Sequence, residues 1–121
     1  MKRVALLGMP NTGKSTLFNR LTGAHAKVGN WPGLTVELLS AKLLVGDQMV
    51  QLVDLPGIYD MHGFSDDEKV VTTFLSTQTT DLLVVLLNTS QLDRQLNFVY
   101  QVMRQDIPVL FVMNMGYDVL D

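Results

Sequence analysis

The sequence contains Gly8-Met9-Pro10-Asn11-Thr12-Gly13-Lys14-Ser15, which matches the pattern G-x-x-x-x-G-K-[ST]. The match directly follows an apolar run at residues 4–7, typical of a strand buried on both faces, and directly precedes a helical pattern. Glycines let such a loop wrap closely around phosphate, and backbone N–H groups at the helix N-terminus attract its charge. We expect Lys14 to reach the β and γ phosphates and Ser15 to offer its hydroxyl to Mg²⁺. A chance glycine loop is the weaker alternative, given the strand and helix on either side.

Further apolar runs predict the other strands of the domain. The expected strands cover residues 4–7, 36–45, 49–53, 82–87 and 109–113. The second and third are joined by Gly46-Asp47, which predicts a tight turn and an antiparallel hairpin. Residues 24–34 are rich in glycine, proline and asparagine, and we expect them to form a loop.

Three helices are expected between these strands. The first begins near Lys14, and the second is opened by Ser65 and Glu68 at capping-box spacing and runs to about residue 76. The third is opened by Ser90, and its apolar positions repeat at helical spacing at Leu92, Leu96, Val99 and Met103. This alternation predicts a three-layer α/β domain over residues 1–121, with a mostly parallel sheet, one antiparallel hairpin, and binding sites at the carboxyl ends of the strands.

Composition excludes several classes of protein. Of the 121 residues, 47% are hydrophobic and 17% charged, which is incompatible with a disordered chain. The net charge of −3 has the wrong sign for a basic nucleic-acid-binding surface. The absence of cysteine excludes disulfides and thiolate metal sites. The longest apolar run, residues 82–87, is far shorter than the roughly 20 residues of a membrane-spanning helix.

A second group of candidate residues follows the predicted hairpin. Asp54-Leu55-Pro56-Gly57 stands where Asp54 can hold Mg²⁺ through water and Gly57 can bring a backbone N–H near the γ-phosphate. The Thr35 hydroxyl can complete the magnesium shell when triphosphate is bound, which would make residues 24–36 a switch. The alternatives are an ordinary Pro-Gly turn and an ordinary β-branched residue entering a strand.

These residues resemble those of a known family. Their order and spacing are similar to the small GTPase fold, with its phosphate loop, and two segments resemble the GTPase domain of the ferrous iron transport protein FeoB family. The segments are Gly29-Asn30-Trp31-Pro32-Gly33-Leu34-Thr35-Val36-Glu37 and Asp54-Leu55-Pro56-Gly57-Ile58-Tyr59, and the resemblance spans essentially all of the chain. It implies GTP hydrolysis at the cytoplasmic face of a bacterial inner membrane. Expected partners are a helical domain that slows GDP release and the transmembrane domains of a transporter; homo-oligomerisation is left open.

The resemblance also implies roles for single residues. GTP or GDP would contact Gly8, Met9, Pro10, Asn11, Thr12, Gly13, Lys14, Ser15, Thr16, Gly33, Leu34, Thr35, Asp54, Leu55, Pro56, Gly57, Asn114, Met115 and Asp118. Catalysis would involve Asn11, Lys14, Thr35 and Gly57. Mg²⁺ would be held by Ser15, Thr35 and Asp54, and K⁺ by Asn11 with the carbonyls of Asn30 and Trp31. We expect the chain to stop before the last strand and helix of the fold.

Two positions depart from the family pattern. Ile58 occupies the place where many small GTPases carry a water-orienting glutamine, so other groups must position the water and turnover should be slow. In Asn114-Met115-Gly116-Tyr117-Asp118 the base-reading acid comes one residue late. Either the loop bulges at Gly116 and Asp118 reaches the base, or guanine selectivity is weakened. A slow nucleotide-sensing module and a nucleotidase with relaxed base selectivity are therefore alternatives to a GTPase.

Metal binding by histidine and the role of the single tryptophan are less defined. His25 and His62 lack companions at ligand spacing, so direct iron binding is the weaker interpretation. For Trp31, in its glycine-rich loop, a partner contact and a lid over the nucleotide are equally open.

Overall fold

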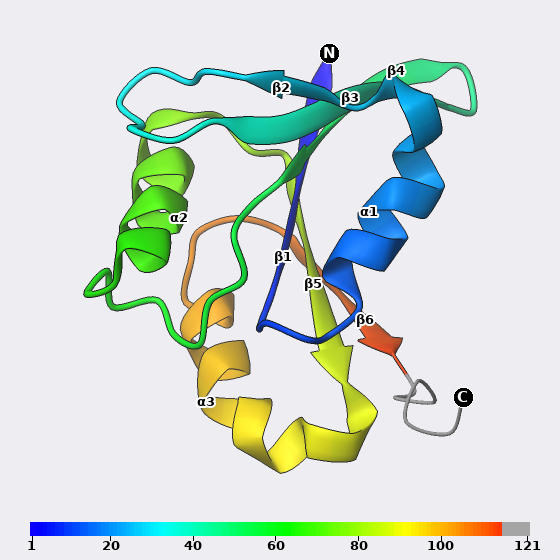
Figure 1. The fold of residues 1–121 in the computed structure, drawn as a ribbon. Helices are drawn as coiled ribbons and strands as arrows, with labels where there is room; N and C mark the ends of the chain where they lie inside the picture. The colour runs from blue at the N-terminus through cyan, green and yellow to red at the C-terminus, as the bar shows by residue number, and fades with distance from the viewer. Residues whose placement is uncertain (115–121) are drawn as a thin grey trace.

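A computed structural model describes residues 1–114 of the chain (Figure 1). In chain order the elements are β1 (Lys2–Gly8), α1 (Lys14–Thr22), the 3₁₀ turn η1 (Gly23–His25), β2 (Lys27–Gly29), β3 (Leu38–Val45), β4 (Gln48–Asp54), α2 (Asp66–Thr77), β5 (Leu82–Asn88), the 3₁₀ turn η2 (Thr89–Gln91), α3 (Leu92–Met103) and β6 (Val109–Asn114). The expected strands and helices are therefore present, with ends that differ by a few residues.

The strands form one sheet in the order β2-β3-β4-β1-β5-β6. β1 lies between β4 and β5 and is parallel to both, and β6 continues the parallel set beyond β5. β3 and β4 form the predicted antiparallel hairpin, with Val45 opposite Gln48 at the turn. The loop expected over residues 24–34 was wrong in one respect, because β2 pairs with β3 within it. A strand of three residues has no apolar run of its own, and its pairing comes from the neighbouring hairpin edge.

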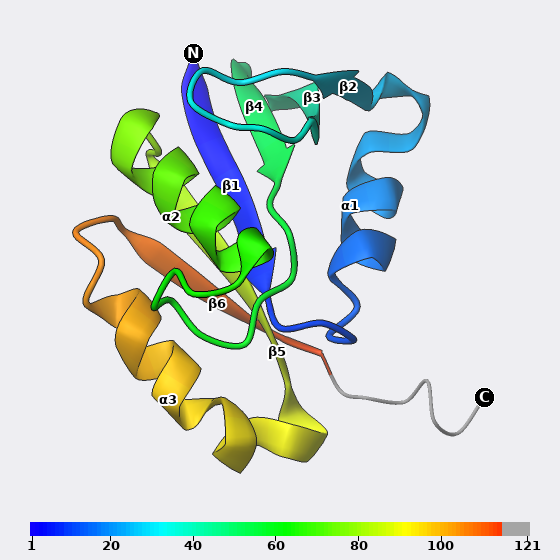
Figure 2. The same cartoon turned by 60° about the vertical axis from the view of Figure 1, so that its left-hand side comes forward.

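The sheet is covered by helices on both faces, as predicted (Figures 1 and 2). Under α2 and α3 lies a large core that includes Val53, Phe74 and Phe98. A smaller core, centred on Phe18 of α1, lies on the opposite face. Burial of these side chains on each side of the sheet holds the three layers together. Within residues 1–114, no helix is both long and apolar enough to cross a bilayer.

The Ser65 cap at the start of α2 is confirmed, whereas the returning bond of Glu68 goes to Phe64, one residue before the position that a full capping box uses. The Ser65 hydroxyl oxygen accepts a hydrogen bond from the backbone N–H of Glu68, with an N-to-O distance of 3.1 Å. The Glu68 carboxylate in turn accepts a hydrogen bond from the backbone N–H of Phe64, 3.0 Å away. Two N–H groups at the helix start are thereby satisfied, so α2 has a defined first turn.

The cap expected for α3 was wrong, and its expected apolar face was right only in part. Leu92 and Val99 pack against the core, but Leu96 and Met103 do not. Asn88, not Ser90, caps the turn before the helix: its side-chain oxygen accepts from the Ser90 backbone N–H. The exposed fractions of Leu96 and Met103 are 58% and 64%, and the core-facing positions are Gln95, Phe98 and Val102. Gln95 can be buried because its amide bonds the backbone of Asn88 and Gln91. Gln95 is therefore buried on the face where the hydropathy pattern predicted Leu96, because the backbone satisfies its amide.

Replacing Ser65 with Ala should lower the free energy of unfolding by about 1 kcal/mol, because it removes the side-chain acceptor of the Glu68 N–H. The measurement is urea unfolding followed by circular dichroism. Ser76→Ala is the matched control, since the Ser76 hydroxyl lies on the exposed side of the same helix and only contacts the Thr73 carbonyl. Equal effects of the two substitutions would contradict the capping role.

Candidate functional site

The loop between β1 and α1 is a tight turn around the helix N-terminus. Gly13, the residue before α1, has φ of 86°, and Asn11 has φ of 67°, the only positive value at a non-glycine residue within the described part of the chain. The buried Thr12 hydroxyl donates to the Met9 carbonyl at 2.9 Å. The loop thus closes on itself and leaves its outer backbone free to face a ligand.

The segment after β4 lies directly against this loop. The backbone N–H of Ile58 donates to the Gly8 carbonyl at 3.0 Å. A Cβ atom added at Gly57 would lie 3.2 Å from the Pro10 nitrogen, and one at Gly8 would lie 3.1 Å from the Leu86 carbonyl oxygen. Glycine at 57 and 8 therefore permits close backbone approach, and the structure brings residues 8–15 and 54–57 together.

Asn114, at the end of β6, contacts the same loop. Its side-chain Nδ2 donates to the Thr12 carbonyl at 2.8 Å, and its own carbonyl accepts from the Thr89 hydroxyl at 3.1 Å. The predicted base-reading segment therefore begins beside the phosphate loop. Met115 and Asp118, the other residues predicted for base contact, lie outside the described residues.

An ion pair joins the loop to β4. The Lys14 ammonium contacts Asp54 Oδ1, and the exposed fractions of the two side chains are 8% and 16%. Each charge compensates the other where solvent is largely excluded. The two residues predicted to serve phosphate and Mg²⁺ therefore bond to each other in this structure.

A cavity of about 500 Å³ opens over the loop. It is lined by Met9, Pro10, Asn11, Gly13, Lys14, Ser15, Thr16, Gly57 and Asp67. We call it the phosphate pocket. Its oxygen donors, the Ser15 hydroxyl with the nearby Asp54 carboxylate, are of the type that Mg²⁺ prefers. Three predicted residues are inside the protein instead: Gly8, Thr12 and Leu55 are buried and support the loop from behind.

Asp67 is the pocket residue that sequence reasoning missed. It belongs to the first turn of α2, ten residues beyond Gly57, and is exposed. Its acidic character was readable as a favourable charge at a helix N-terminus. Only the return of the chain from β4 to α2 reveals that this carboxylate also lines the phosphate pocket.

The predicted switch residues lie elsewhere. Thr35 is exposed and lines a separate cavity of about 390 Å³ with Gly33 and Leu34, and Asp67 lines both cavities. The Trp31 ring packs edge-on against Phe74, with ring centres 5.1 Å apart. Asn30 is exposed and does not line the phosphate pocket. The predicted contacts of Thr35 with Mg²⁺, and of residues 30 and 31 with K⁺, therefore stay predictions that require this loop to move.

A family comparison supplies the identity of the domain. The profile described as "Ferrous iron transport protein B" matches residues 2–121. The chain belongs to the FeoB family. The Fe(2+) transporter FeoB of Synechocystis is 50% identical over 115 residues, and that of Salmonella typhimurium is 40% identical over 116. These alignments cover 95% and 93% of the chain but only 19% and 15% of the relatives, so this family member spans less than a fifth of their length.

Solved FeoB structures share the fold. The G domain of T. maritima FeoB has a TM-score of 0.87 at 32% identity, covering 99% of the chain and 76% of that structure. An S. thermophilus NFeoB mutant bound to GDP has a TM-score of 0.83 at 42% identity, covering 100% of the chain and 47% of that structure. The chain therefore has the fold of a G domain, as the resemblance implied.

In this FeoB family member Ile58 has a structural role. Its side chain is 2% exposed and belongs to the core under α2 and α3. An apolar side chain in the core cannot orient a water molecule, as the sequence indicated.

The two histidines are in separate places. His62 Nδ1 lies 3.4 Å from Asp60 Oδ1, and His25 lines a shallow cavity between β2, β3 and β4. Across residues 1–114, no three His, Cys, Asp or Glu side chains gather into a set that could hold a metal ion.

Replacing Gly13 with Ala should destabilise the fold more than replacing Gly46 with Ala. Both residues have positive φ, so each substitution carries a backbone cost of about 1–2 kcal/mol. At Gly13 the new Cβ would also overlap Asn114 Nδ2, whereas at Gly46 nothing lies within 4 Å. We expect an extra loss of about 1–3 kcal/mol at Gly13 by urea unfolding. Equal losses would show that the contact with Asn114 is easily relaxed.

Proposed function

We propose that this chain is the GTP-binding and GTP-hydrolysing domain of a bacterial ferrous iron transporter. The observation that carries the proposal is the phosphate pocket, in which Lys14, Ser15 and Gly57 meet at the carboxyl ends of β1 and β4. The GDP-bound S. thermophilus relative, 42% identical, supports guanine nucleotide as the ligand. Loop N–H groups at the start of α1 would face the phosphates.

Nucleotide binding requires the Lys14–Asp54 ion pair to separate. Lys14 would turn to the β and γ phosphates, and Asp54 would hold Mg²⁺ through water beside the Ser15 hydroxyl. Mg²⁺ would neutralise charge on the phosphate oxygens. Thr35 would join this shell by moving from its present cavity, which shares Asp67 with the phosphate pocket. Movement of residues 24–36 would thus report the γ-phosphate.

Asn11 is proposed to hold K⁺ beside the phosphates. It lines the pocket, and its amide oxygen is a suitable ligand for a hard cation. The carbonyls of Asn30 and Trp31 would complete the site once the Trp31 ring leaves Phe74. Positive charge at this place would offset charge that develops between the β and γ phosphates.

A slow nucleotide-sensing module is the second candidate. The burial of Ile58 favours it, because no glutamine stands at this position to orient the attacking water. Gly57 lines the pocket beside Pro10, and its backbone N–H is the group proposed to act on the γ-phosphate in place of a side chain. Turnover measured in K⁺ and in Na⁺ separates the two functions, since only the enzyme requires K⁺ stimulation.

Base selectivity is proposed to come from the segment that begins at Asn114, with Asp118 accepting from guanine. Displacement of a fluorescent GDP analogue by GDP and GTP, but not by ADP or ATP, would support this role. Equal displacement by adenine nucleotides would instead support a nucleotidase with relaxed selectivity.

The proposed partners are the remaining domains of the transporter. The relatives are Fe(2+) transporters that extend far beyond the matched region, and one solved relative is the cytosolic domain of L. pneumophila FeoB. We place this domain at the cytoplasmic face of the inner membrane, with its switch loops coupled to Fe²⁺ uptake through helical and transmembrane domains. Homo-oligomerisation stays an untested expectation.

Lys14→Ala should reduce affinity for fluorescent GDP at least a hundredfold, because the phosphates lose their main cationic side chain. Lys42→Ala is the control, since Lys42 is exposed on β3 and does not line the pocket. Circular dichroism checks that both variants fold. Tight GDP binding by a folded Lys14 variant would refute the assignment of the phosphate loop.

Asn11→Ala should abolish stimulation of GTP hydrolysis by K⁺ while sparing GDP binding. Asn11→Gly is the matched variant, because glycine keeps the backbone at φ of 67° without strain and also removes the amide. Hydrolysis rates in K⁺ and Na⁺ test both. A K⁺ response that survives in the glycine variant would place the ion elsewhere.

A further inference from the structure

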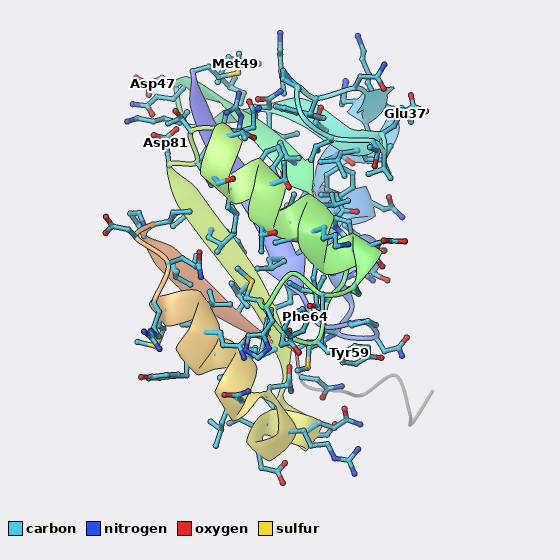
Figure 3. All side chains as sticks on the ribbon, turned by 90° about the vertical axis from the view of Figure 1, so that its left-hand side faces the viewer. Glu37, Asp47, Met49, Tyr59, Phe64 and Asp81 are labelled. Carbon is cyan, nitrogen blue, oxygen red and sulfur yellow. The ribbon has the colours of Figure 1, made fainter. Side chains whose placement is uncertain are left out.

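A second cavity, which we call the Arg94 cavity, adjoins the phosphate pocket. It measures about 460 Å³, and its walls come from the loop after β1, the segment after β4 and the first turn of α3. Met9, Pro10 and Asn11 line both cavities, so a single stretch of loop separates them. In Figure 3 Tyr59, which also lines the Arg94 cavity, lies on the segment that links β4 to α2.

Arg94 gives this cavity its charge. Among the described residues that line the cavity it is the only charged one, and the other polar groups are amides and hydroxyls. Within the part of the chain that the structure describes, Arg94 makes no ion pair and no hydrogen bond. Asp93, the acidic residue in the first turn of α3, is exposed and is not part of the lining. Arg94 is exposed, so the cavity offers a solvent-accessible guanidinium that has no ion-pair partner among the described residues.

The start of α3 adds to this positive character. Gln91, the residue before the helix, lines the cavity and makes no side-chain capping bond. The positive end of the 12-residue helix thus meets the cavity near Arg94. Together with the Tyr59 hydroxyl, these groups give one side of the cavity a positive, hydrogen-bonding character that suits an oxyanion, while Met9 and Pro10 form an apolar side.

We propose that the Arg94 cavity binds inorganic phosphate, with Arg94 as the residue that recognises it. The proposal rests on the proposed function, because GTP hydrolysis releases phosphate on the other side of the shared Met9–Asn11 wall. The planar guanidinium fork matches two phosphate oxygens, and the Tyr59 hydroxyl and the Gln91 side-chain amide can donate to the others. The Ser90, Thr12 and Gln95 side chains already donate to other groups of the chain. The cavity would hold the product before it reaches solvent.

The test is equilibrium dialysis of radiolabelled inorganic phosphate against the chain, with and without saturating GDP. Arg94→Gln should weaken phosphate binding at least tenfold, and Arg94→Lys should weaken it less, since lysine keeps the charge but not the fork. Arg104→Gln is the matched control: Arg104 follows the same helix, lies over the Tyr100 ring and is outside the cavity lining. It should bind phosphate as the unaltered chain does.

Lys14→Ala distinguishes phosphate bound in the phosphate pocket from phosphate bound in the Arg94 cavity. Only binding in the phosphate pocket depends on Lys14, and only binding in the Arg94 cavity depends on Arg94. The Arg94→Gln variant should also tolerate at least tenfold more phosphate before GTP hydrolysis is inhibited. Unchanged phosphate binding in Arg94→Gln, or an equal loss in Arg104→Gln, would overturn the proposal. If the unaltered chain fails to bind GDP, the proposed function falls, and the dialysis without nucleotide still decides the phosphate site.

Discussion

β1 pairs in parallel with a strand on each of its two edges, and this pairing determines where the candidate functional residues of the domain lie. β1 is hydrogen-bonded to β4 on one side and to β5 on the other, and residues 5–8 are buried. A strand held this way must deliver its carboxyl end between those of its neighbours. The phosphate loop, Gly57 and the Arg94 cavity are therefore neighbours because of the sheet, although they are far apart in sequence.

The Lys14–Asp54 ion pair depends on the parallel pairing of β1 and β4. Parallel pairing places the end of β4 beside the end of β1, with Leu6 opposite Asp54, so the carboxylate lies within reach of the lysine at the start of α1. Two largely buried charges are tolerable because each has the other. A ligand that separates them must supply a replacement for both, which phosphate and a divalent cation together do. Charge compensation thus favours binding of the two together over binding of either alone.

Sequence patterns that depend on local chemistry predicted the structure well. The apolar runs of β1 and β5, the Gly46-Asp47 turn and the Ser65 cap each depend on a few adjacent residues, and each is present. Features that depend on distant partners were missed. β2 exists because β3 offers it an edge, and Gln95 is buried because the backbone before α3 satisfies its amide. Asp67 lines the phosphate pocket only through the path of the chain after β4.

The packing of Trp31 affects the intrinsic fluorescence of the protein. Its indole is the only tryptophan in the chain, half-buried between Phe74 of α2 and the guanidinium of Arg3, whose carbon lies 5.1 Å from the ring centre. Indole emission shifts to longer wavelength when the ring passes from an apolar contact into water. Any rearrangement that lifts residues 30–35 from α2 would therefore change the intrinsic fluorescence of the unlabelled protein. The domain thus carries a spectroscopic probe on the loop that is proposed to move when nucleotide binds.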